Sequence, residues 1–392
     1  MKITILKLFY ISLFLMVVII IVGIFENFKS DSELNYEYVS SEVEKKNLSM
    51  KYILQWTKPN TIPFIYMKSG QEGFVQRNCS YTNCYVTSNR ALLDISMYDI
   101  IVFHGPEVIR MKDNQLPSQR SPSQKYVFAS IESSDYYPVC NDRFDKYFNW
   151  TWTYKLNSDQ PFGYISIRDS NFKVIGPKQI MHWTKVDDMD DISYDLRNKL
   201  SSKTKAAAWM VSNCNARSDR QGFVKKLQSE LNKYGLTVDI YGKCGPLKCV
   251  EKDMIECLKI INKDYFFYLS LENSFSEDYV TEKLLHALQN NAVPIVFGDA
   301  NYTRFMPDGI YLNGRELGPE KLAIAMKEII DDPDRYYRLF RWKNHYSYHD
   351  KSEHSETDDY CAFCAMANDE HLMKTVSVYD DFKKWWTPAG RC

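Results

Sequence analysis

Runs of apolar residues alternate with amphipathic stretches along most of the chain, and this alternation predicts an α/β fold. The runs at 97–105 and 125–132 are nearly continuous, as expected of parallel strands that are buried on both faces. Shorter apolar stretches at 52–56 and 162–167 predict two further strands. We expect these strands to form one open α/β domain whose last clear strand ends near Asp169.

The second half of the chain repeats this pattern as a β-α-β-α-β succession. Its expected strands lie at 206–212, 237–242, 265–272 and 292–298. Its expected helices lie at 219–234, 254–261 and 320–331, with another that begins near Asp278 or Thr281. Crossovers between parallel strands are right-handed, and ligands bind outside the carboxyl ends of the strands. We therefore expect a ligand site beyond the strand at 265–272.

A less regular segment at about 170–202 separates the two halves. It contains an acidic group, Asp187, Asp188, Asp190 and Asp191. Spaced aspartates can hold Mg²⁺ or Mn²⁺ with a nucleotide, whereas the simpler interpretation is a solvated linker. We favour the linker, because no strand runs directly into this group to present the carboxylates at its end.

The segment 271–285, LENSFSEDYVTEKLL, places Lys283 in the first turn of a helix whose apolar stripe contains Leu284. The positive end of the helix dipole disfavours a cation at that position. A bound diphosphate would reverse this effect, because a helix start offers unpaired N–H groups to an anion. Glu282, and Glu272 with Asn273 upstream, could then accept hydrogen bonds from ribose hydroxyls or from a base N–H. The alternative, in which Glu282 and Lys283 cap a solvated helix end, stays open on these residues alone.

The N-terminal segment 8–25 is uncharged and apolar, and its length is near the lower end for a membrane-spanning helix. Lysines precede it and acidic residues follow it, so the positive-inside tendency puts 1–7 in the cytosol and the body across the membrane. We expect a single-pass anchor followed by a polar stem at 26–50, with a cleaved signal peptide as the alternative. The formal net charge of −1 gives no indication of nucleic-acid binding.

The chain has 10 cysteines, which suits an oxidising lumen. Glycosylation sequons, Asn-x-Ser/Thr, occur at Asn47, Asn78, Asn149 and Asn301. The spacings Cys79–Cys84 and Cys361–Cys364 allow either a zinc site or disulfides. We favour disulfides, because the two pairs lie so far apart in a chain with this N-terminus.

One stretch is long and specific enough to indicate a family. FYLSLENSFSEDYVTEKLLHALQNNAVPIVFG, at 267–298, closely resembles the signature of the α1,3-fucosyltransferases, which act from GDP-fucose in the Golgi. The resemblance extends to AAAWMVSNCNARSDR, DIYGKCGPLKC, IESSDYYP, NWTWTYKLNSDQPFGY and CAFC, and it covers nearly everything from about Cys79 to Cys364. The GKCGPLKC loop is more similar to invertebrate members, including those that modify the N-glycan core.

The resemblance implies a GT-B fold, in which two Rossmann-like α/β domains face a cleft, with the acceptor on the first and GDP-fucose on the second. The expected organisation is a cytosolic tail at 1–7, an anchor at 8–25, a stem at 26–50, an acceptor domain at 51–185, a linker at 186–202, a donor domain at 203–355 and a C-terminal tail at 356–392. We expect a single-pass type II protein of the Golgi membrane with a lumenal catalytic region.

The family's chemistry is direct displacement with inversion, in which a general base takes the proton from O3 of the acceptor. The resemblance assigns that role to Glu132. The residues agree, because Glu132 ends an apolar strand and should emerge at the carboxyl edge of the sheet. The chain departs from vertebrate relatives at Ser134, where they usually have proline, and at Leu285, where they have tryptophan. The first departure leaves the loop after the base, and the choice of acceptor, open.

On the donor side the resemblance implies that Arg220 and Lys283 contact the diphosphate and that Glu282 holds the ribose. The remaining expected contacts to the nucleotide or fucose are Asn273, Tyr241, Tyr268 and Tyr279. Because arginine, lysine and a helix dipole can stabilise the leaving GDP, no bound metal is obligatory, although Mn²⁺ can stimulate activity.

The resemblance also implies that Cys79 and Cys84 bridge to Cys361 and Cys364, in a pairing that stays open. The partners of the other cysteines are unassigned: Cys140, Cys214, Cys244, Cys249, Cys257 and Cys392. The implied activity is α1,3-fucosyl transfer to O3 of a GlcNAc residue of glycoprotein glycans, with the N-glycan core favoured. A Lewis-type or LacdiNAc-directed enzyme is the alternative acceptor class, and a lumenal glycan-binding relative without turnover is the rival outside enzymes.

Overall fold

The computed structural model describes residues 49–249 and 254–392. No helix in this part of the chain is long and apolar enough to cross a membrane. The predicted anchor at 8–25, nearly all of the stem at 26–50 and the sequon at Asn47 lie outside the described residues.

The first sheet is parallel throughout and has the strand order β2-β1-β3-β4-β5-β6. Its strands are β1 (Lys51–Gln55), β2 (Cys84–Thr87), β3 (Ile100–His104), β4 (Lys125–Ser130), β5 (Trp150–Thr153) and β6 (Gln160–Pro161). Two short helices, α2 (Glu72–Gln76) and α3 (Gly105–Val108), lie beside it. The strands predicted at 52–56, 97–105 and 125–132 are confirmed. The prediction omitted β5, whose sequence WTWT alternates threonine with tryptophan although all its residues are buried.

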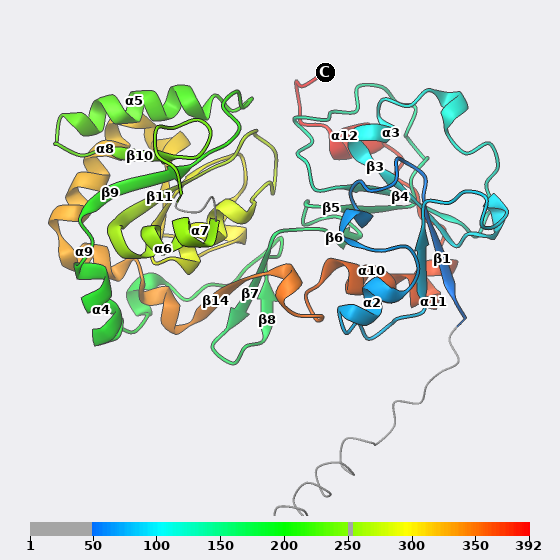
Figure 1. Cartoon of the computed structure of the whole chain (residues 1–392), viewed down its shortest axis with the longest axis horizontal. Coiled ribbons are helices and arrows are strands. Elements are labelled where there is room, and N and C mark those ends of the chain that lie inside the picture. Colours follow the sequence, from blue (N-terminus) through cyan, green and yellow to red (C-terminus); the bar gives the residue numbers. More distant parts are fainter. Residues whose placement is uncertain (1–48, 250–253) are drawn as a thin grey trace, which may run out of the picture. The chain divides into compact units, whose positions relative to one another are not determined.

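The second sheet is also parallel, with the order β10-β9-β11-β12-β13. Its strands are β9 (Lys205–Met210), β10 (Val238–Tyr241), β11 (Tyr265–Leu271), β12 (Val293–Phe297) and β13 (Leu312–Asn313). Its helices are α5 (Arg220–Asn232), α6 (Met254–Asp264), α7 (Glu282–Gln289), α8 (Gly314–Asp331) and α9 (Pro333–Arg338). α5 and α8 cover one face of this sheet, and α6 and α7 cover the other (Figure 1). The α/β fold with two parallel sheets is therefore confirmed.

Successive side chains of β9 point to opposite faces of the sheet, so this strand packs against both helix layers. Ala207 and Trp209 belong to the core under α5 and α8, whereas Ala208 belongs to the core under α6. α8 starts six residues before the predicted helix at 320–331 because a kinked first turn precedes it, with Gly318 at φ 67°. Only glycine adopts that backbone conformation without strain.

A third, antiparallel sheet has the order β14-β7-β8, formed by β7 (Ile165–Asp169), β8 (Val174–Gly176) and β14 (Tyr346–Asp350). This corrects the prediction that the stretch 162–167 belongs to the first domain's sheet. Ile165 and Ile167 pack in one cluster with Leu284 of α7. The apolar pattern of a strand specifies a buried face but not its partners. Here β8 follows β7 directly, whereas the other partner, β14, lies far along the chain.

The predicted linker at 186–202 contains a 3₁₀ turn at Val186–Asp188 and the helix α4 (Tyr194–Ser201). In the acidic group, Asp187 pairs with Arg338 and Asp191 pairs with Arg341. These carboxylates therefore join the segment to α9 and the turn that follows it.

The C-terminal segment forms α10 (Asp359–Asn368), α11 (Glu370–Lys374) and α12 (Phe382–Trp386), which lie beside the first sheet (Figure 1). All 10 cysteines are paired. The disulfides are Cys79–Cys361, Cys84–Cys364, Cys140–Cys392, Cys214–Cys244 and Cys249–Cys257. Three of them connect the C-terminal segment to the first sheet and its loops.

Asn149 corrects one prediction of glycosylation. Its side chain is 7% exposed, its Oδ1 accepts a hydrogen bond from the Tyr126 N–H, and its Nδ2 donates to the Ser377 carbonyl. A glycan on Nδ2 would break these bonds inside the fold. The sequon residues Asn78 and Asn301 are exposed.

Candidate active site

The start of α7 is capped by a buried carboxylate. Glu272 directly follows β11 and is 2% exposed. Its Oε1 accepts hydrogen bonds from the Thr281 backbone N–H at 2.9 Å and from the Thr281 hydroxyl at 3.0 Å. The side chain of Thr281, the N-cap residue of α7, makes no capping hydrogen bond to the helix. The Glu272 carboxylate instead accepts the hydrogen bond of a free N–H at the helix start.

Lys283 lies in the first turn of α7, as the sequence predicts, and two carboxylates surround it. Its Nζ lies 3.2 Å from Glu272 Oε2 and 3.0 Å from Glu282 Oε1, and it donates to the Thr281 hydroxyl at 2.6 Å. Burial disfavours the ammonium charge, but the Glu272 and Glu282 carboxylates outweigh that effect and raise the pKa of Lys283. These carboxylates offset the unfavourable effect of the helix dipole. The Lys283 side chain is 17% exposed, so this cation is not solvated at the helix end, whereas the Glu282 side chain is 46% exposed.

Arg220 is the first residue of α5 and supplies a second buried cation. It is 3% exposed, and its Nη1 donates to the Leu271 carbonyl at 2.7 Å. Its buried Nε has no hydrogen-bond partner among the described residues. Burial lowers the pKa of Arg220, which nevertheless remains charged because a guanidinium starts from so high a value. An orphaned charged donor of this kind is suited to an incoming anion.

Arg220 and Lys283 line one cavity of about 200 Å³, which we call the α7 cavity. Its other walls come from the ends of β9 and β10, from β11 and from the first turns of α6 and α7. The predicted donor residues that line it are Arg220, Tyr241, Tyr268, Glu282 and Lys283. A cavity at the carboxyl ends of parallel strands, with two cations and a helix start, is suited to a nucleoside diphosphate.

Two predicted donor residues are not among the residues that line the α7 cavity. Asn273 accepts a hydrogen bond from the Ser218 N–H through its backbone carbonyl. Tyr279 is 3% exposed and packs edge-on against Tyr154, with ring centroids 4.9 Å apart. The structure therefore gives Tyr279 a packing role rather than a place in this cavity.

Glu132 follows β4 in a loop, and it interacts electrostatically with the start of α7. Burial raises the pKa of the Glu132 carboxyl, Lys283 acts in the opposite direction, and Glu282 adds to the increase. The backbone around Glu132 is fixed on both sides, because Ser130 donates its hydroxyl to the Glu132 carbonyl and Tyr164 donates to the Ile131 carbonyl at 3.1 Å. A carboxylate with a raised pKa that interacts with a cation of the cavity is typical of a general base.

The loop that carries Glu132 is joined to the loop that leads into α7. The hydroxyls of Ser133 and Ser274 lie 2.5 Å apart, and the Asp135 N–H donates to the Ser276 hydroxyl at 3.1 Å. The Ser134 N–H donates to the Tyr154 hydroxyl at 2.9 Å. A proline at 134 would lack this donor, so the departure noted in the sequence has a direct effect on how the loop is held.

Sequence reasoning misplaced Glu272 and missed His286. Glu272 was expected to contact a ribose or a base, but both of its oxygens are engaged with Thr281 and Lys283. Its position directly after a buried strand was the signal for an inward-facing carboxylate. His286 lines the α7 cavity one turn after Glu282, and its Nδ1 lies 3.3 Å from the Tyr268 hydroxyl. Helical spacing from Glu282 would have indicated it.

Comparison with known proteins identifies the family. Residues 48–165 match the family described as fucosyltransferase, N-terminal, and residues 200–385 match glycosyltransferase family 10 (fucosyltransferase), C-terminal part. Alpha-(1,3)-fucosyltransferase C of Drosophila melanogaster is 36% identical over 80% of this chain and 71% of that protein. The chain belongs to glycosyltransferase family 10, the fucosyltransferases.

Other proteins named as fucosyltransferases are similar over much of the chain. Glycoprotein 3-alpha-L-fucosyltransferase A of Drosophila melanogaster is 32% identical over 83% of this chain, which spans only 59% of that relative's length. A crystal structure of an α1,3-fucosyltransferase with GDP has a TM-score of 0.50 at 14% identity, and the match covers 87% of this chain and 95% of that one. The structural match agrees with the fold, and the family makes this protein a glycosyltransferase.

Proposed function

We propose that this fucosyltransferase transfers L-fucose from GDP-β-L-fucose to O3 of a GlcNAc residue in glycoprotein glycans. The observation that carries the proposal is the α7 cavity, which Arg220 and Lys283 line from the starts of α5 and α7. Lys283 also interacts electrostatically with the Glu132 carboxyl. The names of the relatives, α1,3-fucosyltransferases among them, support the linkage and the sugar.

In the proposed mechanism the displacement is direct and inverts the anomeric carbon. The acceptor O3 attacks C1 of fucose as the bond from C1 to the β-phosphate oxygen breaks, and Glu132 takes the O3 proton. The GDP that leaves carries the electron pair of the broken bond. Arg220, Lys283 and the α7 N-terminus stabilise the charge that develops on it.

Donor binding would rearrange the charges around Lys283. Its ammonium is shared between Glu272 and Glu282 in the structure. A diphosphate would compete for that ammonium, and Glu282 would be free to accept hydrogen bonds from the ribose. Tyr241 and Tyr268, which line the same cavity, would pack against the nucleotide or fucose.

The N-glycan core is the acceptor we propose. The similarity to a relative named glycoprotein 3-alpha-L-fucosyltransferase A supports it. Antennary acceptors are the second candidate, because a chimpanzee relative named 4-galactosyl-N-acetylglucosaminide 3-alpha-L-fucosyltransferase FUT6 is 30% identical over 75% of this chain. Ser134 lies two residues from the proposed base, so its loop is where the two acceptor classes would be distinguished.

A transfer assay on a panel of acceptors tests the function. With GDP-fucose, we expect an α1,3-fucoside on the innermost GlcNAc of an N-glycan and little product on LacNAc or LacdiNAc. Linkage analysis of the product reports the position and the anomeric form. Product on antennae alone would reassign the acceptor, and no product on any GlcNAc-containing acceptor would make this protein a glycan-binding relative.

We propose that transfer needs no bound metal, because Arg220, Lys283 and the α7 start supply the positive charge that the leaving diphosphate requires. Dialysis against EDTA should therefore leave most of the rate, and added Mn²⁺ should stimulate it without being required. A rate that falls to background after chelation and returns with Mn²⁺ would contradict this.

We also propose a type II location in the Golgi membrane with the catalytic region in the lumen. Complete pairing of the cysteines supports an oxidising compartment. The uncharged segment 8–25, with lysines before it, supports the orientation.

A further inference from the structure

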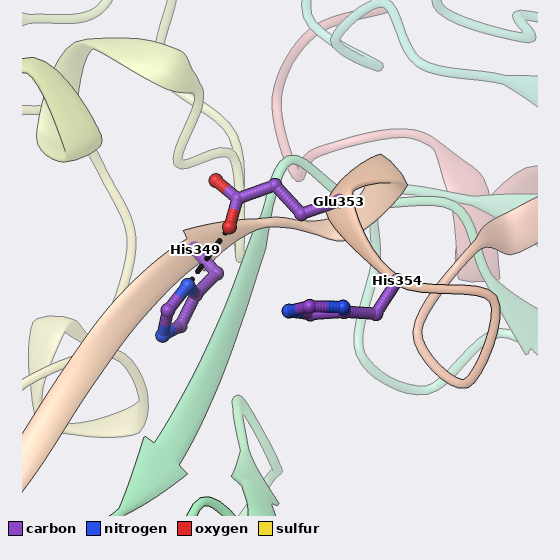
Figure 2. A group of neighbouring side chains, drawn as sticks. All are labelled: His349, Glu353 and His354. Atoms are coloured by element: carbon purple, nitrogen blue, oxygen red, sulfur yellow. Dashed lines mark hydrogen bonds and ion pairs between the residues drawn. The ribbon is translucent and has the colours of Figure 1, made fainter. Parts of the chain in front are cut away.

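A group of metal-ligating side chains lies outside the α7 cavity, at the end of β14. His349 belongs to β14, and Glu353 and His354 come from the 3₁₀ turn Lys351–Glu353 and the residue after it. Figure 2 shows the His354 ring turned toward His349, with Glu353 above the same gap. One potential ligand atom from each of the three side chains lies within 4.8 Å of the other two.

We propose that His349, Glu353 and His354 bind a zinc ion. Two imidazoles and one carboxylate form a recognised zinc donor set, with a water completing four-coordination. Tetrahedral zinc with bonds of about 2.1 Å holds its ligand atoms about 3.4 Å apart, so small side-chain rotations bring the three into place. Oxygen-preferring cations such as Mg²⁺ and Ca²⁺ are poorly matched to a site with two imidazoles.

The backbone already holds two of the three ligands close together. His349 Nδ1 lies 2.8 Å from Glu353 Oε2, and the Asp350 N–H donates to Glu353 Oε1 at 3.1 Å. The Asp350 carboxylate in turn caps the 3₁₀ turn. Zinc would therefore replace an existing contact between His349 and Glu353 and needs no new fold in this segment.

The nearby cation in sequence is already paired. Lys351 lies between the ligands in sequence, but its ammonium pairs with Asp359 and donates to the Pro161 carbonyl. The side chains of His349 and Glu353 are 20% and 41% exposed, so an ion has direct access from solvent.

Bound zinc would fasten β14 to the turn that leads into α10. β14 pairs with β7, and α10 carries Cys361 and Cys364 of two disulfides. None of the three ligands lines the α7 cavity. We therefore expect the ion to stabilise the fold by binding the native state and to be dispensable for fucose transfer.

Calorimetric titration of ZnCl₂ into the full chain, stripped of metal beforehand, tests the site. We expect one zinc ion per chain and a higher melting temperature with zinc. His349→Ala or His354→Ala should weaken binding by at least about 10-fold, since loss of even an outer-shell partner costs about 10–100-fold. The double variant that combines His349→Ala with His354→Ala should lose both the zinc binding and the increase in melting temperature. His371→Ala, which removes an exposed imidazole of α11, is the matched control and should bind like the wild type.

Glu353→Gln keeps the size of the side chain and most hydrogen bonds of the turn. It therefore tests whether the carboxylate charge is needed for zinc binding, even if an alanine variant fails to fold. It should also weaken zinc binding. Unchanged stoichiometry and affinity in the folded double variant or in Glu353→Gln would overturn the proposal, as would a wild type that binds no zinc. Competition by Mg²⁺ or Ca²⁺ at equal concentration would also contradict it.

Discussion

Glu132→Gln should reduce kcat for fucose transfer by about 100- to 10,000-fold, the range that a positioned general base contributes. Glutamine has nearly the same shape but cannot take the acceptor proton. GDP binding should stay near the wild-type value, because Glu132 is not among the residues that line the α7 cavity. Steady-state kinetics with a fixed acceptor, together with calorimetric GDP binding, separates the two effects.

The pH profile gives an independent test of the same residue. The base must be ionised to act, and burial raises the pKa of Glu132. The wild-type rate should therefore fall on the acid side at a higher pH than an ordinary glutamate, near 4.3, would give. This acid limb should be absent from the residual rate of Glu132→Gln.

Glu320→Gln, which changes an exposed carboxylate of α8, provides the matched control and should leave both the rate and the profile unchanged. A Glu132→Gln enzyme with a near-normal kcat would assign the base to another residue. A variant that loses GDP binding along with its rate would indicate a role in the donor site instead.

Lys283→Ala should weaken GDP binding by about 10- to 150-fold, which corresponds to the roughly 1.5–3 kcal/mol of a hydrogen bond to a charged group. The same change removes the cation that neutralises the buried Glu272 carboxylate. The melting temperature should therefore fall as well, because an uncompensated buried charge is destabilising. Calorimetric titration with GDP and thermal unfolding measure the two effects separately.

A double variant, Lys283→Met with Glu272→Gln, distinguishes binding from stability. Removing both charges should restore much of the melting temperature without restoring GDP affinity. Lys225→Ala, which removes an exposed lysine of α5, controls for the net charge of the same sheet and its helices. GDP affinity that survives Lys283→Ala undiminished would show that the diphosphate binds elsewhere.

The sequence predicted those strands and helices whose apolar pattern is set by residues close together in the chain. Continuous apolar runs located β3, β4, β11 and β12, because such runs are typical of strands that are buried on both faces. The unusual cation at a helix start indicated Lys283 as a candidate, with a solvated helix cap as the open alternative. The position of Glu132 after an apolar strand agrees with a place at the sheet edge. For both residues the role in the chemistry is implied by the family resemblance and not by position alone.

Other features depend on residues far apart in the chain, and the local pattern could not show them. β7 carries an ordinary strand pattern, yet it pairs with β14 rather than with the first sheet. The Asn149 sequon is intact in sequence, but the fold uses its amide to join Tyr126 to Ser377. Glu272 was expected to contact a ribose or a base, whereas in the structure its carboxylate contacts Thr281 and Lys283 at the start of α7.

The disulfides Cys79–Cys361, Cys84–Cys364 and Cys140–Cys392 join residues near both ends of the folded part of the chain, so that this part forms a covalently closed ring. A protease that cuts one peptide bond between residues 84 and 361 opens this ring without releasing a fragment. The donor-binding half would stay tethered to the half that carries Glu132, with both sheets still folded. Reduction alone would not separate them either, so domain release requires a cut and a reductant together.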